Sequence, residues 1–468
     1  EIYTLSLHDA LPISSWEELM KILVVGGGGR EHAIVKRISE NPSVEKIFAL
    51  PGNGGIAGFA ECVPIPATDI ERIVDFAVEK EIDFAVVAPD DPLIMGCADL
   101  LREKGIAVFG PSKKAAQIEG SKSYSKAFMK KYGIPTAAYE EFTSYEEALN
   151  YIKAQGSYPT VIKADGPALG KGVIIAEDEA MAEAALRSMM KEKVFGASGD
   201  KVVIEEFLEG PEITVLAFCD GVGIRPMLSS MDHKKAGDGD TGLNTGGMGV
   251  IAPNPFYTEA VEREVYEKIM LPTINGLIKE GAPFKGCIYF GLMLTKDGVR
   301  VIEYNCRFGD PEAQTVLPML KNDLLNIMIS IEKGRMQEMD IEFAEGASCC
   351  VVIASGGYPK EYAKGYEMDF SGLFGDDPKA QAAAKFETED GITVFHAGTK
   401  VEFAGGDPVY RTNGGRVLNI VAVAENLEAA IKKAYDAAEK IEFKDMFFRK
   451  DIGEKALTQL KSGESHRG

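Results

Sequence analysis

The sequence predicts a multidomain protein of mixed α/β and α+β class, with an N-terminal doubly wound parallel sheet, a central α+β domain and a small C-terminal α+β domain. From residue 20 to 120, apolar strands alternate with helical segments, the pattern of a parallel sheet covered by helices on both faces. From 121 to 340, strands come in closely spaced pairs, as in hairpins. The length of 468 residues suits about three domains; the third is expected at 341–455, followed by a tail, 456–468.

Residues 1–19 differ from the sequence that follows them. They contain no Lys or Arg, so they lack the basic region of a signal or transit peptide. Met20 opens a strong strand directly after them. We expect a non-native or disordered extension at 1–19 and the native start at Met20; an amphipathic N-terminal helix is the alternative. Deleting residues 1–19 is expected to leave activity intact, and a large loss would refute this interpretation.

The N-terminal block combines apolar strands with a helix over 30–41 that carries Ile34, Val35 and Ile38 on one face. Because ligands of open α/β sheets bind at the carboxyl ends of the strands, the segments that follow each strand are candidate binding loops. The expected strands are 21–26, 45–50, 83–89 and 106–110.

The segment GGGGREH, 26–32, lies between the first strand and this helix, where backbone amides and the helix dipole favour an anion. It fails as a dinucleotide fingerprint, because the third glycine position holds Glu31 or His32 and no acidic residue follows the second strand. A phosphate-bearing small molecule is the better interpretation, with a purely structural turn as the alternative. The candidate ligands are Gly28, Gly29 and Arg30, together with Asn53 in PGNGG and Asp90 in PDDP.

The central block opens with helices, one of which starts at Ser144 with Glu147 in a capping box and stops at Gly156. Its composition predicts a loop over 238–249, which is rich in Gly, Asp, Asn and Thr. The expected strand pairs are 160–165 with 172–176, 201–208 with 213–219, and 286–294 with 300–305.

Candidate phosphate ligands gather around the glycine-rich segment GPALGKG, 166–172. Its glycines can bring backbone amides close to phosphate oxygens, and Lys171 adds charge. Lys163 precedes it in a strand, and Lys122 near a helix start can supply another cation. The alternatives are an ordinary glycine-rich hairpin and solvated surface lysines.

The segment IEEFLEGPE, 204–212, places Glu205 and Glu212 on either side of a turn. Main chain that runs from a strand into a linker can pair with a purine edge, and a carboxylate can accept hydrogen bonds from ribose hydroxyls. On composition alone, an acidic surface hairpin is the preferred interpretation.

The segment VIEYNCRFGDPE, 301–312, carries the sharpest signal. Alternate residues of a strand share a face, so Glu303 and Asn305 point the same way. Two hard oxygen ligands suit Mg²⁺, which takes its remaining ligands from phosphates and water. Arg307 can clamp a carboxylate or phosphate through two hydrogen bonds. Burying these groups without ligands would be costly, which disfavours a purely structural interpretation.

The segment from 232 to 249 is dense in groups that bind small polar ligands: Asp232 can hold an ammonium and Lys234 a phosphate. We expect His233 to be an orienting hydrogen-bond partner and His396 to be a satisfied histidine in a strand. The C-terminal block adds strands at 349–355, 392–398 and 415–424 and a helix over 427–440.

Composition excludes several classes of partner. The formal charge of −21 disfavours general binding to nucleic acid or an anionic membrane. No apolar run approaches the roughly 20 residues that span a bilayer. The seven cysteines are odd in number with no C-x-x-C spacing, which is typical of reduced thiols in a cytoplasmic protein. We expect a cytoplasmic monomer acting on small molecules.

Taken in order, these segments resemble the ATP-grasp superfamily, and within it the phosphoribosylamine–glycine ligase (glycinamide ribonucleotide synthetase) family. The resemblance covers 20–455. It implies a Rossmann-like substrate domain at 20–120, followed in the chain by a central ATP-grasp domain at 121–340. The motifs that carry it are KILVVGGGGREHA, PGNGG, YPTVIKADGPALGKGV, EEFLEGPE, DHKKAGDGDTGLNTGGMG, VIEYNCRFGDPE, VFHAGT, GGRVLN and FFRKDIG.

The resemblance implies ligation of glycine to 5-phosphoribosylamine by an ATP-dependent enzyme of purine biosynthesis, through a glycyl phosphate. It places ATP between two halves of the central domain, with Mg²⁺ or Mn²⁺ on Glu303 and Asn305. Glycine would lie near Asp232 and Arg307, which with Lys163 form the expected catalytic set. The expected ATP ligands are Lys122, Lys163, Gly170, Lys171, Gly172, Glu205, Glu206, Phe207, Leu208 and Glu212.

The chain departs from the family pattern at Pro167, Lys235 and Asp90, where Leu, Arg and Glu are usual; none of these removes an expected metal or phosphate ligand. The nearest alternative function is another ATP-grasp carboxylate–amine ligase of purine synthesis. A nicotinamide oxidoreductase and a catalytically inactive binding protein are alternatives from other classes. The broken fingerprint opposes the oxidoreductase, and the intact Lys163, Glu303, Asn305 and Arg307 oppose the inactive protein.

Overall fold

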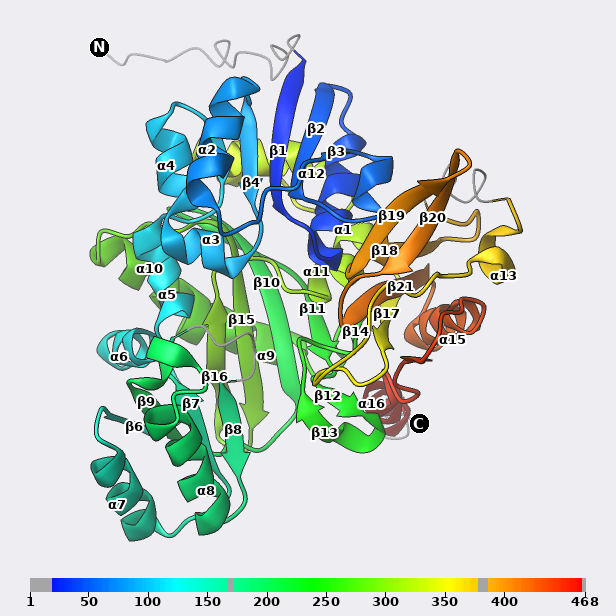
Figure 1. Cartoon of the computed structure of the whole chain (residues 1–468). Coiled ribbons are helices and arrows are strands. Elements are labelled where there is room, and N and C mark those ends of the chain that lie inside the picture. Colours follow the sequence, from blue (N-terminus) through cyan, green and yellow to red (C-terminus); the bar gives the residue numbers. More distant parts are fainter. Residues whose placement is uncertain (1–18, 167–171, 378–385, 465–468) are drawn as a thin grey trace, which may run out of the picture.

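The N-terminal block forms a five-stranded parallel sheet in the computed structural model, which describes residues 19–166, 172–377 and 386–464. The strand order β3-β2-β1-β4-β5 places β1 at the centre, where it pairs with β2 and β4 (Figure 1). This confirms the doubly wound parallel sheet. The strands are β1 (Met20–Gly26), β2 (Val44–Pro51), β3 (Glu61–Cys62), β4 (Phe84–Val87) and β5 (Ala107–Phe109).

Alternate residues of β1 pack into different apolar cores, because successive strand side chains point to opposite faces. Leu23 packs with residues of α2 (Ile70–Glu79) and α4 (Cys97–Glu103). Val24 packs with residues of α1 (Gly29–Ser39) and α12 (Leu324–Glu332). One covering helix, α12, thus comes from far along the chain.

A four-stranded antiparallel sheet with the order β6-β9-β7-β8 forms a separate unit at the bottom of Figure 1. Helices α7 (Tyr145–Gln155) and α8 (Glu179–Leu186) share its apolar core. As expected, the Ser144 side chain caps α7 by accepting from the Glu147 amide, and Gly156 ends the helix in the left-handed conformation. The strands are β6 (Tyr139–Phe142), β7 (Thr160–Ala164), β8 (Val173–Ala176) and β9 (Val202–Glu206).

A nine-stranded sheet joins the central and C-terminal blocks. Its order is β16-β15-β10-β11-β14-β17-β21-β18, with β22 paired to β17. The expected boundary at 340/341 therefore divides the chain but not the sheet. The strands are β10 (Glu212–Asp220), β11 (Ile224–Asp232), β14 (Gly249–Ala252), β15 (Lys285–Thr295), β16 (Gly298–Asn305), β17 (Ala347–Ser355), β18 (Ile392–His396), β21 (Arg416–Ala424) and β22 (Met446–Phe447).

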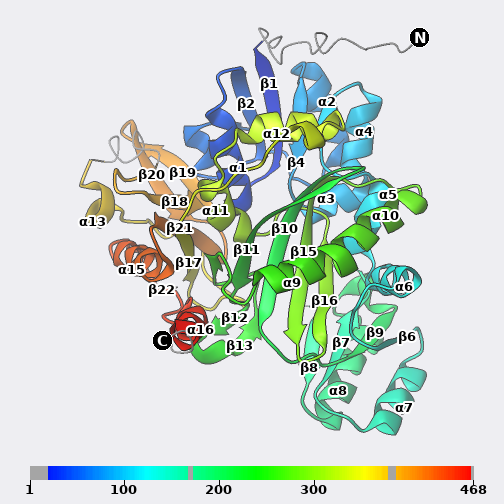
Figure 2. The same ribbon diagram turned by 180° about the vertical axis from the view of Figure 1, so that it is seen from behind.

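Helices cover this sheet on both sides. Figure 2 shows α9 (Glu259–Val265) and α10 (Leu271–Lys279) in front of the strands, where they share an apolar core with β10, β15 and β16. The C-terminal core places α15 (Leu427–Ala438) against β17 and β21 on this same face, and α11 (Glu312–Val316) and α12 cover the opposite face. The remaining elements named below are α5 (Lys113–Gly120), α6 (Lys122–Tyr132), α16 (Glu454–Glu464), β12 (Lys235–Gly237), β13 (Thr241–Asn244), β19 (Thr399–Ala404) and β20 (Asp407–Thr412).

Two local predictions are wrong. The expected pair 201–208 with 213–219 does not form, because β9 pairs with β6 and β7 while β10 pairs with β11 and β15 in the large sheet. The expected loop over 238–249 contains β13, which pairs with β12, and reaches the start of β14. Within 19–166, 172–377 and 386–464, every helix is too short or too polar to cross a bilayer.

Candidate active site

A pocket of about 790 Å³ lies between the four-stranded sheet and the large sheet. Every block of the chain contributes to its lining. The structure thus brings most of the expected residues together. Those that line the pocket are Arg30, Asp90, Lys122, Lys163, Gly172, Glu205, Glu206, Phe207, Leu208, Glu212, Asp232, Lys234, Glu303, Asn305 and Arg307.

Gly28, Gly29 and Asn53 are not brought onto the pocket wall. The Gly28 amide donates to the Glu31 carboxylate at 2.6 Å, within a capping box. The Asn53 side chain donates to the carbonyls of Gly27 and His396 and accepts from two amides of its own turn. These groups brace the turn after β1. The expected ligands Gly170 and Lys171 lie outside the described residues.

Three buried charged side chains contact one another at the four-stranded sheet. Lys163 Nζ lies 3.0 Å from Glu205 Oε1, and Lys126 Nζ lies 2.8 Å from Glu205 Oε2. Lys126 also donates to the Thr136 hydroxyl at 2.8 Å. Burial lowers the pKa of Lys126 to about 8, while Glu205 opposes that shift. Glu205 therefore holds two lysines in place, and its own charge offsets one of theirs.

Lys234 bridges two expected ligand carboxylates across the pocket. Its Nζ lies 3.1 Å from Glu212 Oε2 and 3.7 Å from Glu303 Oε1. Burial alone would lower the pKa of Lys234, but these carboxylates outweigh it and raise the pKa well above its ordinary value. Lys234 is thus a fixed positive charge beside the expected ribose and metal sites.

Glu303 and Asn305 both line the pocket from β16, as the strand alternation predicts. Burial alone would raise the pKa of Glu303, but nearby lysines, led by Lys234 and Lys163, lower it and keep the carboxylate ionised. No three His, Cys, Asp or Glu side chains of the described ranges gather to hold a metal ion. An ionised carboxylate beside an amide oxygen fits a cation that takes its other ligands from phosphates and water.

Arg307 is held by a glutamate that the sequence did not single out. Its Nη2 lies 3.1 Å from Glu119 Oε1, and Glu119 Oε2 accepts from the Cys306 amide at 2.6 Å. Arg307 Nε is buried without a hydrogen-bond partner in the described structure. Burial alone would raise the pKa of Asp90, but Arg307 and Arg30 outweigh it and lower the pKa. Arg307 thus lines the pocket with one guanidinium donor unmatched by the described residues.

Asp232, which is half-buried, and Glu312, which is buried, form an acidic pair in the pocket lining. Burial, reinforced by Glu312, raises the pKa of Asp232 well above its ordinary value. Burial also raises the pKa of Glu312. Among the described atoms, Asp232 Oδ1 has no hydrogen-bond partner. A cation bound here would restore the charge of the carboxylate, so the site suits an ammonium group.

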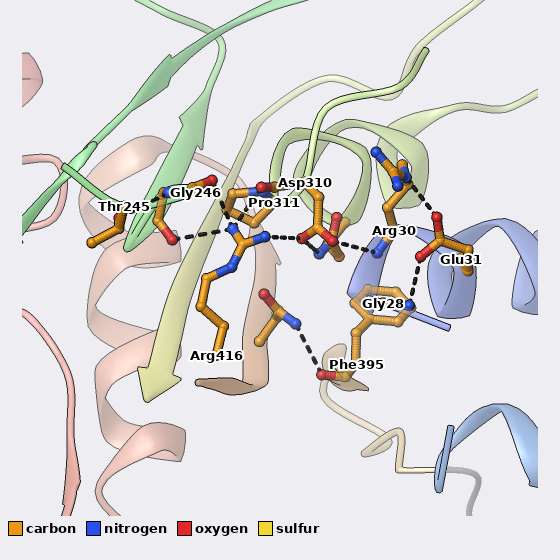
Figure 3. Close-up of polar contacts among 12 residues, drawn as sticks. Gly28, Arg30, Glu31, Thr245, Gly246, Asp310, Pro311, Phe395 and Arg416 are labelled. Carbon is orange, nitrogen blue, oxygen red and sulfur yellow. Dashed lines mark hydrogen bonds and ion pairs between the residues drawn. The ribbon is translucent and has the colours of Figure 1, made fainter. Parts of the chain in front are cut away.

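The C-terminal block contributes Arg416 from β21. Figure 3 shows its guanidinium pointing toward Asp310 and the loop at Gly246. The side chain donates to the carbonyls of Gly246 and Asp310 at 2.7 and 2.6 Å, and its Nη2 lies 3.3 Å from Asp310 Oδ1. The other Asp310 oxygen accepts from the Arg30 amide at 3.5 Å. This chain of contacts ties all three blocks together at the pocket.

The expectations for His233 and His396 agree with the structure to different extents. His233 is confirmed as an orienting partner, since Nδ1 lies 3.1 Å from the Gly249 carbonyl and Nε2 accepts from the Gly453 amide at 3.1 Å. His396 is satisfied only in part: Nδ1 pairs with Thr399, but Nε2 is buried without a partner in the part of the chain described.

Sequence reasoning assigned no role to several pocket residues. Lys126 had one usable signal, its place one helical turn after Lys122. Glu312 and Arg416 lie inside motifs in which other residues, or no single residue, were assigned a role. Glu119 had no usable signal in the sequence, because only the fold brings it to Arg307.

The comparisons with known proteins cover the same segments. Residues 20–119, 120–313 and 348–455 match the N, ATP-grasp (A) and C domains of phosphoribosylglycinamide synthetase. The chain is 48% identical over 434 residues to the phosphoribosylamine–glycine ligase of Clostridium acetobutylicum, covering 93% of this chain and 99% of that protein. It is 47% identical over 433 residues to that of Caldanaerobacter subterraneus subsp. tengcongensis, covering 92% and 99%. The solved phosphoribosylamine–glycine ligase of Thermotoga maritima has a TM-score of 0.75 and 33% identity, covering 92% of this chain and 99% of that one.

Proposed function

The chain belongs to the phosphoribosylglycinamide synthetase family, and from this membership we propose how its pocket works as an ATP-dependent carboxylate–amine ligase. The reaction joins glycine to 5-phosphoribosylamine and converts ATP to ADP and phosphate, giving glycinamide ribonucleotide in de novo purine biosynthesis. The observation that carries the proposal is that lysines, an ionised carboxylate with an amide, and the half-buried Arg307 all line the same pocket.

The chemistry requires activation of the glycine carboxylate. Direct attack by an amine would have to expel oxide, which is a very poor leaving group. A glycine oxygen therefore attacks the γ-phosphorus of ATP, the bond to ADP breaks, and glycyl phosphate forms. The amine of phosphoribosylamine then attacks the acyl carbon, loses a proton, and expels phosphate. Positioning and charge neutralisation dominate such transfers, and no protein nucleophile is required.

ATP is assigned to the space between the two sheets. Lys163, held at Glu205, and Lys122, which lines the same wall, would contact the phosphates. The main chain at 206–208 lines the pocket where β9 ends and would read the adenine edge. Glu212 would accept from the ribose hydroxyls, and Gly172 borders the phosphates at the end of its loop.

ATP-grasp ligases use a divalent metal with ATP, and we assign Mg²⁺ or Mn²⁺ to Glu303 and Asn305. When bound, the metal would neutralise charge on the phosphates during transfer. Lys234, beside Glu303, adds positive charge to the same region. The ionised state of Glu303 and the hard oxygen donors support this assignment.

Arg307 and Asp232 are assigned to glycine. The Arg307 guanidinium would bind the carboxylate, and the Asp232 carboxylate would accept from the ammonium, since both residues line the pocket. The sugar phosphate is assigned to the wall formed by Arg30 and Asp90. Gly28, Gly29 and Asn53 would support that wall by shaping the turn.

The test is ADP release with each component omitted in turn. ATP, Mg²⁺ and glycine are combined with phosphoribosylamine made in situ from ribose 5-phosphate and ammonia. ADP release that requires both glycine and the sugar amine is the expected result. Release without glycine would favour another ATP-grasp carboxylate–amine ligase, and no release from folded protein would refute the assignment.

We also propose that the enzyme acts on small molecules alone, as a cytoplasmic monomer. The charge of −21 opposes binding to nucleic acid or anionic membranes. All seven cysteines are free thiols in the structure, which suits a reducing compartment. Sedimentation equilibrium tests the monomer, and a larger mass would refute it.

A further inference from the structure

The motif FFRKDIG, 447–453, takes no part in the proposed chemistry, yet it contains Arg449, whose side chain is only 1% exposed. A guanidinium is buried this deeply only when its donors are matched by acceptors. Its partners therefore indicate what the motif does.

Arg449 is clamped on one side and reaches the β12–β13 hairpin on the other. Nε and Nη2 donate to the two oxygens of Asp451, each at 2.7 Å. Nη1 donates to the Lys235 carbonyl at 3.1 Å and to Asp240 at 2.9 Å. The planar fork thus fixes the hairpin relative to the C-terminal segment, which a lysine cannot do.

Backbone amides make further contacts between the hairpin region and the C-terminal segment. Asp451 accepts from the Gly239 amide and Asp238 accepts from the Lys450 amide, each at 2.8 Å. The Gly453 amide donates to His233 Nε2 at 3.1 Å. The hairpin itself is a separate two-stranded sheet, and such a sheet is marginally stable alone. Its position therefore depends on these contacts.

These contacts flank Lys234, one of several pocket-lining residues in this segment. The Gly453 amide holds the His233 side chain, and Arg449 holds the Lys235 carbonyl, so one residue is anchored on each side of Lys234. The Lys234 ammonium is then directed at Glu212 and Glu303.

We propose that Arg449, clamped by Asp451, is a positioning residue that holds Lys234 in place beside the nucleotide and metal ligands. The proposal rests on the proposed function for what Lys234 serves. Arg449 does not line the pocket and acts through the hairpin it anchors, including Asp240, which does line the pocket.

The test is a double-mutant cycle with Arg449→Lys and Lys234→Met. The readouts are kcat/KM and the affinity for Mg²⁺ with the non-hydrolysable ATP analogue AMP-PNP, measured by isothermal titration calorimetry. Arg449→Lys is expected to lower both values about tenfold or more, since small misplacements are costly. In the Lys234→Met background, Arg449→Lys is expected to change the affinity by less than about twofold, because the lysine that Arg449 positions is already absent.

Arg411→Lys is the matched control: Arg411 also pairs with two carboxylates, but on the β19–β20 hairpin outside the pocket lining. Equal losses in both backgrounds, or a fully active Arg449→Lys protein, would overturn the proposal. If Arg449→Lys fails to fold by circular dichroism, Asp451→Asn replaces it in the cycle with the same expected results. A wild-type protein that binds AMP-PNP but shows no glycine-dependent ADP release would instead count against the proposed function.

Discussion

At the scale of single residues, the pocket is organised by pairs of buried opposite charges. Glu205 joins Lys126 to Lys163, and Glu119 holds Arg307. A buried charge without a partner is strongly destabilising, so removing one member affects the other. Lys163 and Arg307 are therefore each held by a carboxylate, which favours a site shaped before ligands arrive.

Glu303→Ala is predicted to reduce metal-dependent turnover at least about 100-fold, because the proposed metal site would lose its assigned carboxylate. The fold should be kept, since Glu303 lies at the pocket surface. Turnover is measured across a Mg²⁺ titration, with Glu61→Ala, an exposed glutamate paired with Lys46, as control. Turnover like that of wild type would show that the metal assignment is wrong.

Arg307→Lys is predicted to raise the KM for glycine about tenfold or more, because a point charge cannot replace a fork that binds Glu119 and a ligand together. Initial rates at varied glycine concentration measure the effect. Arg187→Lys, on an exposed arginine paired with Glu183, is the control and should leave KM unchanged. Equal KM values in both variants would remove Arg307 from the glycine site.

Local pattern predicted well the residues that line the pocket, and it predicted poorly the residues that support them. Glu303 and Asn305 were found because strand alternation is a local rule. Glu119 and Lys126 were not, since their partners lie far along the sequence and only tertiary packing brings them together. Asn53 was expected to bind a ligand, yet it accepts hydrogen bonds from amides of its own turn. A polar side chain in a glycine-rich turn can thus serve the turn itself.

At the scale of elements, periodicity found the strands, but spacing did not determine which strands pair. The segment between β9 and β10 is short enough for a hairpin, yet it passes from one sheet to the other. Gly210 has a φ of +149°, and a Cβ added there would lie 2.0 Å from the Leu294 carbonyl oxygen of β15. A glycine thus permits the crossing, and a sequence pattern alone does not distinguish it from a turn.

Ser144→Ala is predicted to destabilise the four-stranded unit by about 1 kcal/mol, since it removes the side chain that caps α7. Urea unfolding followed by circular dichroism measures the loss. Ser144→Asp should retain stability, because Asp is an equally good cap and favours the helix dipole. Both variants should keep activity, as Ser144 does not line the pocket. An alanine variant as stable as wild type would contradict the prediction.

At the scale of the whole molecule, the expected domains share their cores. One apolar cluster contains Val24 of β1, Leu216 of β10, Leu325 of α12, Val352 of β17 and Val421 of β21. The blocks were correctly predicted as segments with different strand patterns. Their joint packing could not be predicted, because an apolar residue does not reveal which partner covers it. The pocket therefore depends on a framework to which all three blocks contribute.

This framework encloses neutral histidines, which predicts how stability depends on pH. Burial lowers the pKa of His32 to about 3 and that of His233 to about 4. It lowers the pKa of His396 well below its ordinary value. In the unfolded chain these groups titrate near pH 6.5. As the pH falls from 6.5 toward 4, the unfolded chain binds more protons than the folded one, so the free energy of unfolding decreases.

His233→Gln tests this by comparing slopes, so that carboxylates common to both proteins cancel. Each histidine contributes up to about 1.4 kcal/mol per pH unit in that window. The variant should lose this much of the slope of unfolding free energy against pH, measured by urea unfolding from pH 7 to 4.5. Ser144→Ala is the matched control, since it lowers stability without removing a titrating group, and its slope should equal that of wild type. An unchanged slope in His233→Gln would mean that His233 is protonated in the folded protein, and its hydrogen bond from Gly453 would then be misassigned.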